Sequence, residues 1–342
     1  MKKIGYALLG CGAIGKLHAG VIDRLPNGYL AAVCSRNVEV TNQMKEKYGC
    51  KTYQTIDEML KDDDVEVVSV CLPSSLHRDA VIACAKAKKH VVCEKPIDIS
   101  QEKGQEMVDI CNEYGVTFGV IFQHRFDEAV LAVEKAVKEG KFGKLLWGAS
   151  RTIWYRDDVY YSPAGRGTWE ADGGGALMIQ AIHYIDLLTK FFGQVKSVNG
   201  KCRTMLHHNI EVEDVGVANV EFKNGCVATI EGSTACYPGL YAELALFGEK
   251  GTAIIRNDHL LFYQLDSGKD ASLDAVIDIE KASAQNLSAA VADDSHYRQF
   301  ADFTDAIIEG RRPAIIGADA LHSVAVINAI YESSDKKKEI YL

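Results

Sequence analysis

The chain lacks the features that would suit a nucleic-acid-binding or membrane protein. Its 38 Lys and Arg residues are outnumbered by 47 Asp and Glu residues, which gives a formal net charge of -9 at pH 7. Nucleic-acid binding calls for a basic surface instead. No apolar run in the sequence approaches the ~18 residues that a membrane-spanning helix needs. We therefore expect neither a nucleic-acid partner nor a membrane partner.

The sequence also lacks paired cysteines. Ten cysteines are present, but none form a C-x-x-C pair. Several lie in apolar runs, as Cys34, Cys71 and Cys93 do, where a free thiol behaves as a small buried apolar group. This usage favours a reducing, cytoplasmic location over a disulfide framework. Because Cys and His residues are not clustered, we expect no metal site, and we interpret His207 and His208 as part of a polar turn.

A glycine-rich loop follows the first apolar run. Residues 4–9 are typical of a buried strand, the next six read Gly-Cys-Gly-Ala-Ile-Gly, and residues 16–25 have helical apolar spacing. This places G-x-G-x-x-G between a strand and a helix, the setting of a dinucleotide site. The glycines permit a tight turn, close approach of a pyrophosphate and close packing of helix on strand, while the helix start offers free N–H groups. The predicted cofactor contacts here are Gly10, Gly12, Ala13, Ile14 and Gly15.

Strand-like and helical segments alternate as far as residue 122. With 342 residues, two domains are expected, because single cores stop growing near ~250–300 residues. The alternation predicts an α/β domain over residues 1–122, a Rossmann-type doubly wound parallel sheet. Ser100 is the expected N-cap of one of its helices. The expected strands are 4–9, 29–35, 51–53, 65–72, 90–93 and 116–122, and the expected helices are 16–25, 38–48, 56–60, 76–88 and 100–114.

The end of the second strand bears on the choice of cofactor. An acidic residue there would bond the ribose 2′-hydroxyl of NAD. The sequence instead has Ser35 and Arg36. A cation favours the 2′-phosphate of NADP, whereas Ser35 can also bond a hydroxyl, so NADP is favoured slightly and NAD stays open. Further cofactor contacts are expected from residues after later strands: Leu72, Pro73, Ser74, His77, Glu94, Lys95 and Gln123. Capping of a loop is the alternative role for residues 73–77.

Lys95 follows the short apolar run 90–93, in the sequence Cys93-Glu94-Lys95-Pro96. The carboxyl edge of a parallel sheet is where open α/β folds bind ligands. Pro96 fixes its own φ and keeps the preceding residue out of the helical region. A cis bond before Pro96 would serve the same turn. The sequence therefore predicts a placed, functional lysine, with a surface lysine in a loop as the alternative.

The pattern changes after residue 122. Consecutive β-rich runs with short turns predict an antiparallel sheet, and Asn224-Gly225 is a hairpin signal. We expect residues 123–342 to form an α+β domain with a large, mostly antiparallel open sheet, which binds substrate and pairs subunits into a homodimer or homotetramer. Residues 265–295 are interpreted as a loop or hairpin excursion. The expected strands are 145–154, 195–202, 212–222, 227–233, 240–247, 252–256 and 259–264, and the expected helices are 128–139, 297–309 and 318–332.

A second stretch of candidate functional residues runs from Gly173 to Asp186. Three glycines open a helix on which Ile179 and Gln180 share a face with His183. Aromatic and arginine residues in the preceding loop suit stacking on a sugar ring and gripping an anionic or polar substituent. A core histidine bonded to a backbone carbonyl is the alternative for His183. The predicted substrate contacts are Arg125, Trp154, Arg156, Tyr160, Arg166, Trp169, Ile179 and Gln180.

Together these motifs resemble the glucose–fructose oxidoreductase / inositol dehydrogenase (Gfo/Idh/MocA) family. The likeness is carried by the glycine loop, Glu94-Lys95-Pro96, Arg125-Phe126, the Gly173–Asp186 stretch and the segment from Phe303 to Pro313, in order along nearly the whole chain. It implies NAD(P)-dependent chemistry on sugars, inositols and related polyols. It also implies that Lys95 lies near the substrate hydroxyl and that His183 is the acid/base. The family often has an aspartate four residues before that histidine, where this chain has Ile179.

The sequence thus predicts an oxidoreductase that moves a hydride between a nicotinamide and a ring hydroxyl or ketone of a sugar, glycoside, nucleotide sugar or cyclic polyol. The isoleucine at position 179 disfavours an inositol-type mechanism supported by a carboxylate and favours nucleotide sugars or glycosides. Two alternatives stay open. One is a glycoside-cleaving enzyme that uses bound NAD transiently, and the other is a non-catalytic dinucleotide-binding sensor.

Overall fold

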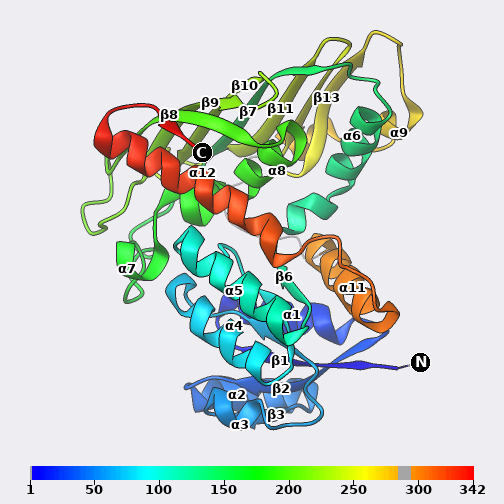
Figure 1. Ribbon diagram of the computed structural model, residues 1–342, viewed down its shortest axis with the longest axis vertical. Helices are drawn as coiled ribbons and strands as arrows, with labels where there is room; N and C mark the ends of the chain where they lie inside the picture. Colours follow the sequence, from blue (N-terminus) through cyan, green and yellow to red (C-terminus); the bar gives the residue numbers. More distant parts are fainter. Residues whose placement is uncertain (1, 284–293) are drawn as a thin grey trace. The chain divides into compact units, whose positions relative to one another are not determined.

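The computed structural model describes residues 2–283 and 294–342 (Figure 1). The chain divides into two compact units. The first consists of Met1–Gln123 with Val291–Leu321, and the second of His124–Ala290 with His322–Leu342. A late segment of the sequence therefore belongs to the same unit as the N-terminus, which the succession of motifs along the chain does not reveal.

A six-stranded, fully parallel sheet forms the centre of the first unit. Its strand order, β3-β2-β1-β4-β5-β6, reverses direction at β1, which is the doubly wound arrangement of dinucleotide-binding domains. Every residue of β1 is buried, as expected for a strand covered on both faces. The predicted parallel sheet is confirmed. The strands are β1 (Ile4–Leu9), β2 (Gly28–Cys34), β3 (Lys51–Tyr53), β4 (Val67–Val70), β5 (His90–Cys93) and β6 (Phe118–Val120).

The helices of this unit begin and end at residues with clear capping chemistry. The Ser100 side chain accepts a hydrogen bond from the backbone N–H of Lys103, so the predicted cap is confirmed. Gly49 and Gly115 end two helices in the left-handed conformation, at φ of 69° and 66°. The helices are α1 (Ala13–Asp23), α2 (Val38–Tyr48), α3 (Ile56–Met59), the 3₁₀ turn η1 (Ser74–Leu76), α4 (His77–Lys86), α5 (Gln101–Tyr114) and α11 (Asp294–Glu309).

Helix α11 explains why the late segment joins the first unit. Its Phe300 and Phe303 are buried in the same apolar cluster as Ile4 and Tyr6. The Tyr6 hydroxyl lies 2.7 Å from the Thr304 hydroxyl, which satisfies both buried groups. The Rossmann-type core is therefore completed by residues almost 300 positions away from its first strand.

An eight-stranded sheet forms the centre of the second unit, in the order β13-β12-β11-β7-β10-β9-β8-β14. Among the described strands of this second sheet, only β7 and β10 form a parallel pair, so the predicted mostly antiparallel sheet is confirmed. Asn224-Gly225 forms the predicted turn between β9 and β10, with Gly225 at φ 86°. The strands are β7 (Leu145–Ile153), β8 (Val195–Arg203), β9 (Val215–Phe222), β10 (Val227–Ser233), β11 (Tyr241–Gly248), β12 (Gly251–Arg256), β13 (His259–Leu265) and β14 (Ile340–Tyr341).

One local prediction for the C-terminal half needs a correction and a limit. Residues 265–295 were expected to form a loop or hairpin but contain two short helices, and residues 284–293 of that range lie outside the described residues. The last residues of the chain, beyond the exposed Lys336–Lys338, pair with β8 through β14. The helices are η2 (Gln123–Phe126), α6 (Glu128–Lys138), α7 (Trp169–Asp172), the π-helix η3 (Ala176–Ala181), α8 (Ile182–Phe192), α9 (Ala271–Asp274), α10 (Ile279–Ser283) and α12 (Gly317–Lys336).

Glycines in the sheet determine how closely the η3–α8 segment packs on it. A Cβ atom at Gly148 of β7 would lie 2.6 Å from the Phe192 ring, and at Gly216 of β9 it would lie 2.6 Å from Leu177. Helix α8 packs against β7 and β11 while α6 packs against β12 and β13, on the face of the sheet that carries both helices in Figure 1. The η3–α8 segment can therefore pack this closely on the sheet because the strands have glycines, which lack side chains, at the contact positions.

No helix in the described ranges is long and apolar enough to cross a membrane.

Candidate active site

The glycine loop has the geometry that a dinucleotide requires. Gly10 has φ +98°, and a Cβ there would lie 2.5 Å from the Cys71 carbonyl oxygen. A Cβ at Gly15 would lie 2.2 Å from the Gly10 oxygen, so packing within the unit demands both glycines. A Cβ at Gly12 would meet nothing within 4 Å, and no side chain caps the start of α1. Room beside Gly12 and the N–H groups of the helix start suit the pyrophosphate of a dinucleotide.

The other residues predicted to bind cofactor in this unit follow adjacent parallel strands. Strands β2, β1, β4 and β5 are neighbours, so the residues after their carboxyl ends share one edge of the sheet. Ser35 accepts a hydrogen bond from the Asn37 N–H at 3.2 Å, and Arg36 is exposed. The structure thus brings the glycine loop to the same edge as the following predicted contacts: Ser35, Arg36, Leu72, Pro73, Ser74, Glu94 and Lys95. Gln123 is buried at the end of the unit, after β6.

His77 connects two of the turns at this edge. Its Nδ1 lies 2.9 Å from the Pro96 carbonyl oxygen and its Nε2 lies 2.9 Å from the Leu72 carbonyl oxygen. The ring is almost fully buried. These contacts favour the alternative in which His77 holds the loops together over one in which it bonds the cofactor. The Lys95–Pro96 peptide bond is cis.

Beneath the Lys95 turn lies a buried ion pair that the sequence did not suggest. His18 of α1 is fully buried, and its Nε2 lies 3.0 Å from Oε1 of the buried Glu94. The other carboxylate oxygen, Oε2, accepts a hydrogen bond from the Lys95 N–H at 3.1 Å. The remaining ring nitrogen of His18 lies 2.8 Å from the Ser69 hydroxyl and 3.2 Å from the Cys71 sulfur. The backbone of Lys95 is therefore anchored to the glycine-loop helix through one carboxylate.

The ionisation of this pair follows from its surroundings. Burial alone would lower the pKa of His18, but the contacts with Cys71 and Glu94 outweigh burial and raise it to about 10. Burial alone would raise the pKa of Glu94, but the hydrogen bond and charge of His18, with the charge of Lys95, lower it to about 2. At neutral pH the pair is an imidazolium and a carboxylate. Such a pair stabilises a fold only while both charges are present.

In the second unit, His183 occupies the first turn of α8, directly after the π-helix η3. π-helical turns are rare and often lie at functional sites. Arg125, predicted to bind substrate, instead donates two hydrogen bonds of 2.6 Å to Asp186 of the same helix. The Asp186 carboxylate is almost fully buried and also accepts from Ser323. This pairing favours a role for Arg125 in holding α8 over direct contact with a substrate.

Arg156 is the centre of a cluster of predicted substrate contacts. Its guanidinium carbon lies 5.0 Å from the Trp154 ring centroid and 5.2 Å from that of Tyr160. Its Nη2 donates to Oε1 of Gln180 at 2.9 Å, and the Gln180 amide donates to the Tyr160 hydroxyl at 2.6 Å. The Arg166 guanidinium stacks on Tyr160 at 4.6 Å. Among the described residues, the buried Arg156 Nε and Trp154 Nε1 have no hydrogen-bond partner.

Two buried carboxylates support this cluster and the glycine run. His207 binds Asp214 at 3.0 Å through Nδ1, and its Nε2 lies 2.7 Å from the Arg156 carbonyl oxygen, so this member of the predicted polar turn is buried, whereas His208 lies in an exposed turn. Glu213 accepts hydrogen bonds from the N–H groups of Gly175 and Leu177, and burial raises its pKa to about 7. A Cβ at Gly175 would lie 1.8 Å from the Glu213 carbonyl oxygen, which explains the glycine there.

Trp169 makes its hydrogen bond and its ring contact with residues outside the Arg156 cluster. Its indole N–H donates to the Glu211 carbonyl oxygen at 3.1 Å, and its ring packs edge-on against Tyr331 at 5.2 Å. Ile179, also predicted as a substrate contact, lies in η3 and donates its N–H to the Gly175 carbonyl oxygen. The second unit thus assembles Trp154, Arg156, Tyr160, Arg166 and Gln180, and leaves Arg125 and Trp169 with structural contacts.

A Rossmann sheet with a glycine loop, joined to a unit with an open, mostly antiparallel sheet, is the architecture of a dinucleotide-binding protein with a second domain. The comparisons with known proteins agree. Residues 4–122 match the oxidoreductase family with an NAD-binding Rossmann fold (GFO/IDH/MocA), and residues 130–254 match the C-terminal domain of the same family. The chain belongs to the GFO/IDH/MocA family of oxidoreductases, as its resemblance implied.

Similar proteins include a solved structure and curated sequences. The structure of the WlbA dehydrogenase from Bordetella pertussis, in complex with NADH and UDP-GlcNAcA, is 30% identical with a TM-score of 0.91, covering 100% of this chain and 98% of that one. Myo-inositol 2-dehydrogenase from Thermotoga maritima is 26% identical over 98% of this chain and 97% of its own length. The 2,7-anhydro-N-acetylneuraminate hydratase of Escherichia coli is 28% identical over 73% of this chain and 66% of its own length.

The His18–Glu94 pair predicts a two-sided dependence of stability on pH. The raised pKa of His18 contributes stability that is complete below its ordinary value of 6.5 and is lost as pH rises towards about 10. The lowered pKa of Glu94 contributes stability that is complete above its ordinary value of 4.5 and is lost as pH falls towards about 2. Glu94→Gln should therefore lower the free energy of unfolding by about 3–5 kcal/mol near pH 5.5, and by less at pH 9.

Urea unfolding at pH 5.5 and pH 9 measures this difference. Glu106→Gln is the matched control, because Glu106 pairs with Arg78 on the surface of the same unit, and the loss of an exposed pair should leave the free energy of unfolding nearly unchanged. A Glu94→Gln effect that is equally small, or equal at the two pH values, would contradict a buried ion pair at this turn.

Proposed function

We propose that Lys95 and His183 perform hydride-transfer chemistry on one ring hydroxyl of a carbohydrate-type substrate. The observation that carries this proposal is the Lys95 turn, which lies at the same sheet edge as the glycine loop and is anchored by the buried Glu94. A lysine fixed beside a dinucleotide site is placed for chemistry on whatever the cofactor contacts. The acid/base role of His183 rests on family resemblance and on its position at the start of α8.

Each residue has a distinct part in the oxidation direction. The neutral imidazole of His183 takes the proton of the substrate hydroxyl, which suits a base that works near pH 7. The Lys95 ammonium donates a hydrogen bond to the same oxygen and stabilises the negative charge that develops on it. The nicotinamide, when bound, supplies the hydride acceptor. In the reverse direction the same residues return the proton to the carbonyl oxygen of the substrate.

We infer further that the substrate carries an acidic group. The Arg156 cluster offers two buried N–H donors without a partner among the described residues, together with aromatic faces for a sugar ring. A buried donor without an acceptor costs about 1–3 kcal/mol, which a carboxylate or phosphate of a ligand would offset. The similar WlbA dehydrogenase is described in complex with UDP-GlcNAcA. A nucleotide sugar that bears a carboxylate is therefore the proposed substrate class.

The choice between NAD and NADP follows from the turn after β2. Arg36 is exposed there, and Ser35 bonds its own turn. We propose that the protein accepts both dinucleotides, with a small preference for NADP through the Arg36 guanidinium. NADH in the complex of the WlbA relative supports the use of the non-phosphorylated cofactor.

A second candidate function is transient use of bound NAD without net oxidation. It is favoured by the similarity to a 2,7-anhydro-N-acetylneuraminate hydratase, since a hydration changes no net oxidation state. The two functions differ in their products. A dehydrogenase forms one reduced dinucleotide for each substrate consumed, whereas the alternative consumes substrate with no accumulation of reduced dinucleotide. A non-catalytic sensor would bind dinucleotide and consume no substrate.

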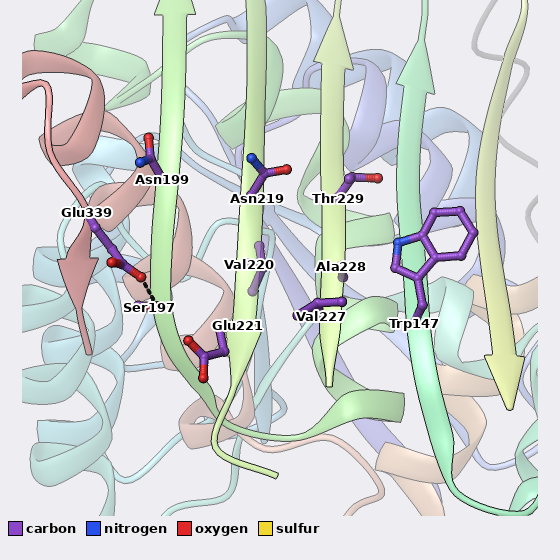
Figure 2. Close-up of a pocket in the computed structure, with 10 residues that line it drawn as sticks. All are labelled: Trp147, Ser197, Asn199, Asn219, Val220, Glu221, Val227, Ala228, Thr229 and Glu339. Carbon is purple, nitrogen blue, oxygen red and sulfur yellow. Dashed lines mark hydrogen bonds between the residues drawn. The ribbon is translucent and has the colours of Figure 1, made fainter. Parts of the chain in front are cut away.

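Self-association through the open face of the second unit's sheet is part of the proposal. A hollow of about 340 Å³ lies on strands β7–β10. Figure 2 shows Trp147, Asn199, Asn219 and Thr229 among the side chains that line it. Trp147 is 38% exposed although it stacks on Phe247 at 4.4 Å. A broad sheet face with exposed apolar side chains is typical of an interface. We propose that a second copy covers this face, in a homodimer or homotetramer.

Two further proposals concern the whole chain. We propose that residues 1–122 bind the dinucleotide and that residues 123–342 bind substrate and pair the subunits. We also infer a reducing, cytoplasmic location, which the ten free cysteines support. Several thiols have raised pKa values through burial, as Cys11 does at about 12, which makes them poor nucleophiles and poor partners for disulfide exchange.

Substitution of Lys95 and His183 tests their roles. Lys95→Met should lower kcat about 10²–10³-fold by removing the charge at the developing alkoxide, and His183→Asn should lower it by about 10²–10⁴-fold. The measurement is the formation of reduced dinucleotide from UDP-GlcNAcA and related sugars with NAD and with NADP, next to dinucleotide binding by fluorescence. Lys86→Met and His208→Asn, both exposed, are the controls. Unchanged turnover in Lys95→Met and His183→Asn would reject the assignment.

Substitution of Arg156 tests the acidic substrate. Arg156→Gln should raise KM for UDP-GlcNAcA about 10–100-fold, because a charge-assisted hydrogen bond is worth about 1.5–3 kcal/mol. KM for the neutral sugar UDP-N-acetylglucosamine should change by less than about threefold. Arg203→Gln, an exposed arginine at the end of β8, is the control. Equal changes in KM for the acidic and the neutral sugar would show that Arg156 does not bind the acidic group.

Charge placed in the sheet face tests self-association. Trp147→Glu should shift the molar mass from a dimer or tetramer towards a monomer, since an interface with a buried, unpaired carboxylate is disfavoured by several kcal/mol. Size-exclusion chromatography with light scattering gives the mass. Ile308→Glu, at a similarly exposed apolar residue of α11 (39%), should leave it unchanged. A monomeric wild type, or a Trp147→Glu variant that assembles as the wild type does, would contradict the proposal.

A further inference from the structure

The residue four positions before His183 is an isoleucine, Ile179, so the usual partner of this histidine is missing. The resemblance assigns the task of orienting this histidine to an aspartate four residues earlier, and an isoleucine side chain neither accepts nor donates a proton. A group that orients the His183 ring must then come from another element. His124 of η2 is such a group in the second unit, since its ring centroid lies 4.9 Å from that of His183.

His124 is clamped by two carboxylates from different elements. Its Nδ1 lies 2.8 Å from Oδ2 of Asp127, at the start of α6, and 3.0 Å from Oδ1 of Asp258, in the turn between β12 and β13. Asp258 is itself held, because the Tyr184 hydroxyl donates to its Oδ1 at 2.9 Å and its N–H donates to the Tyr184 oxygen at 3.1 Å. The position of the His124 ring is thus determined by three elements of one unit.

The charge of His124 follows from this clamp. Burial alone would lower its pKa, but Asp258 and Asp127 outweigh burial and raise it well above the ordinary value. His124 is therefore an imidazolium at neutral pH. Its ring meets the His183 ring edge to face, at 87° between planes. A cationic ring attracts a neutral aromatic neighbour in this geometry and repels a second imidazolium.

We propose that His124 is a positioning residue for His183, holding its ring in one orientation and in the neutral form. The inference rests on the proposed role of His183 as the base. A carboxylate in the usual place would orient a histidine and raise its basicity, whereas the clamped His124 orients the ring and disfavours its protonation. A base that stays neutral is ready to accept the hydroxyl proton in oxidation. The group in contact with the His183 ring is thus a cation, where the resemblance has a carboxylate, although the clamp as a whole is negative.

The other charged groups near this helix are neutralised by partners. Asp186 of α8 pairs with Arg125, Lys190 of α8 pairs with Glu134 of α6, and Glu243 of β11 pairs with Arg151 and Arg256. Tyr184 stays neutral, because burial and Asp258 raise its pKa well above the ordinary value. His259 follows Asp258 directly and helps to lower the pKa of that carboxyl, after His124. The clamp of one imidazolium and two carboxylates has a net charge of −1, and the imidazolium is the member whose ring meets the His183 ring.

Two substitutions in the clamp should move the titration of His183 in opposite directions. Asp258→Asn removes one negative charge, so the His183 resonance should titrate at a pH lower by about one unit. His124→Phe keeps an aromatic ring but removes the positive charge, so the resonance should titrate at a pH higher by a similar amount. Tyr184→Phe removes a hydrogen bond and no charge, and should leave the midpoint within about 0.3 units.

The measurement is an NMR titration of the full-length protein with ¹³C-labelled histidine, in the presence of EDTA so that no adventitious metal ion occupies the clamp. The His183 signal is identified by its loss in His183→Asn. Opposite shifts support the inference, and shifts of one sign, or none, overturn it. If His124→Phe fails to fold, the downward shift in the near-isosteric Asp258→Asn decides alone. A purely structural role for His124 would lower thermal stability without these shifts.

The titration does not depend on turnover, so the proposed function and the role of His124 can be rejected independently. If His183→Asn retains full hydride transfer, the proposed function is wrong, while opposite shifts would still show the electrostatic coupling. If His183→Asn abolishes turnover and the shifts are absent, the proposed function stands and only the role of His124 is wrong.

Discussion

A charge that is taken out of water must have an opposite charge beside it, and each functional segment of this protein is built on that constraint. Glu94 is buried under the Lys95 turn and is paired with His18. Asp186 is buried in the helix of His183 and is paired with Arg125. These pairs connect elements that are distant in sequence, so the turns and helices that carry the proposed catalytic residues have little freedom to move away from them.

The same constraint separates residues proposed to bind ligand from residues that hold the site. Arg125 and His77 looked like ligand contacts, yet their polar atoms meet Asp186 and two backbone carbonyls. Arg156 differs, because its Nε has no partner in the part of the chain that the structure describes. Residue type alone does not distinguish an arginine that clamps a carboxylate of its own fold from one that is available to a substrate.

Local chemistry made much of the fold predictable. The alternation of strands and helices predicted the parallel sheet, Ser100 predicted a helix start, and Asn224-Gly225 predicted a hairpin, because each depends on neighbours in sequence. The parallel pairing of β7 with β10, the strand β14 and the packing of Phe300 on Tyr6 were not predicted. Each joins segments more than 70 residues apart. His18 and His124 were missed for the same reason, since their partners Glu94 and Asp258 lie far along the chain.

The central claim is that this chain transfers a hydride from a ring carbon of a sugar to a nicotinamide. The most direct test uses UDP-GlcNAcA with deuterium at each ring position in turn, and mass spectrometry of the dinucleotide recovered after one turnover. The account predicts that deuterium from one ring carbon, and from no other, appears in the reduced nicotinamide in stoichiometric amount, and that Lys95→Met and His183→Asn lose this transfer. A substrate that is consumed while no deuterium is retained by the dinucleotide would contradict it.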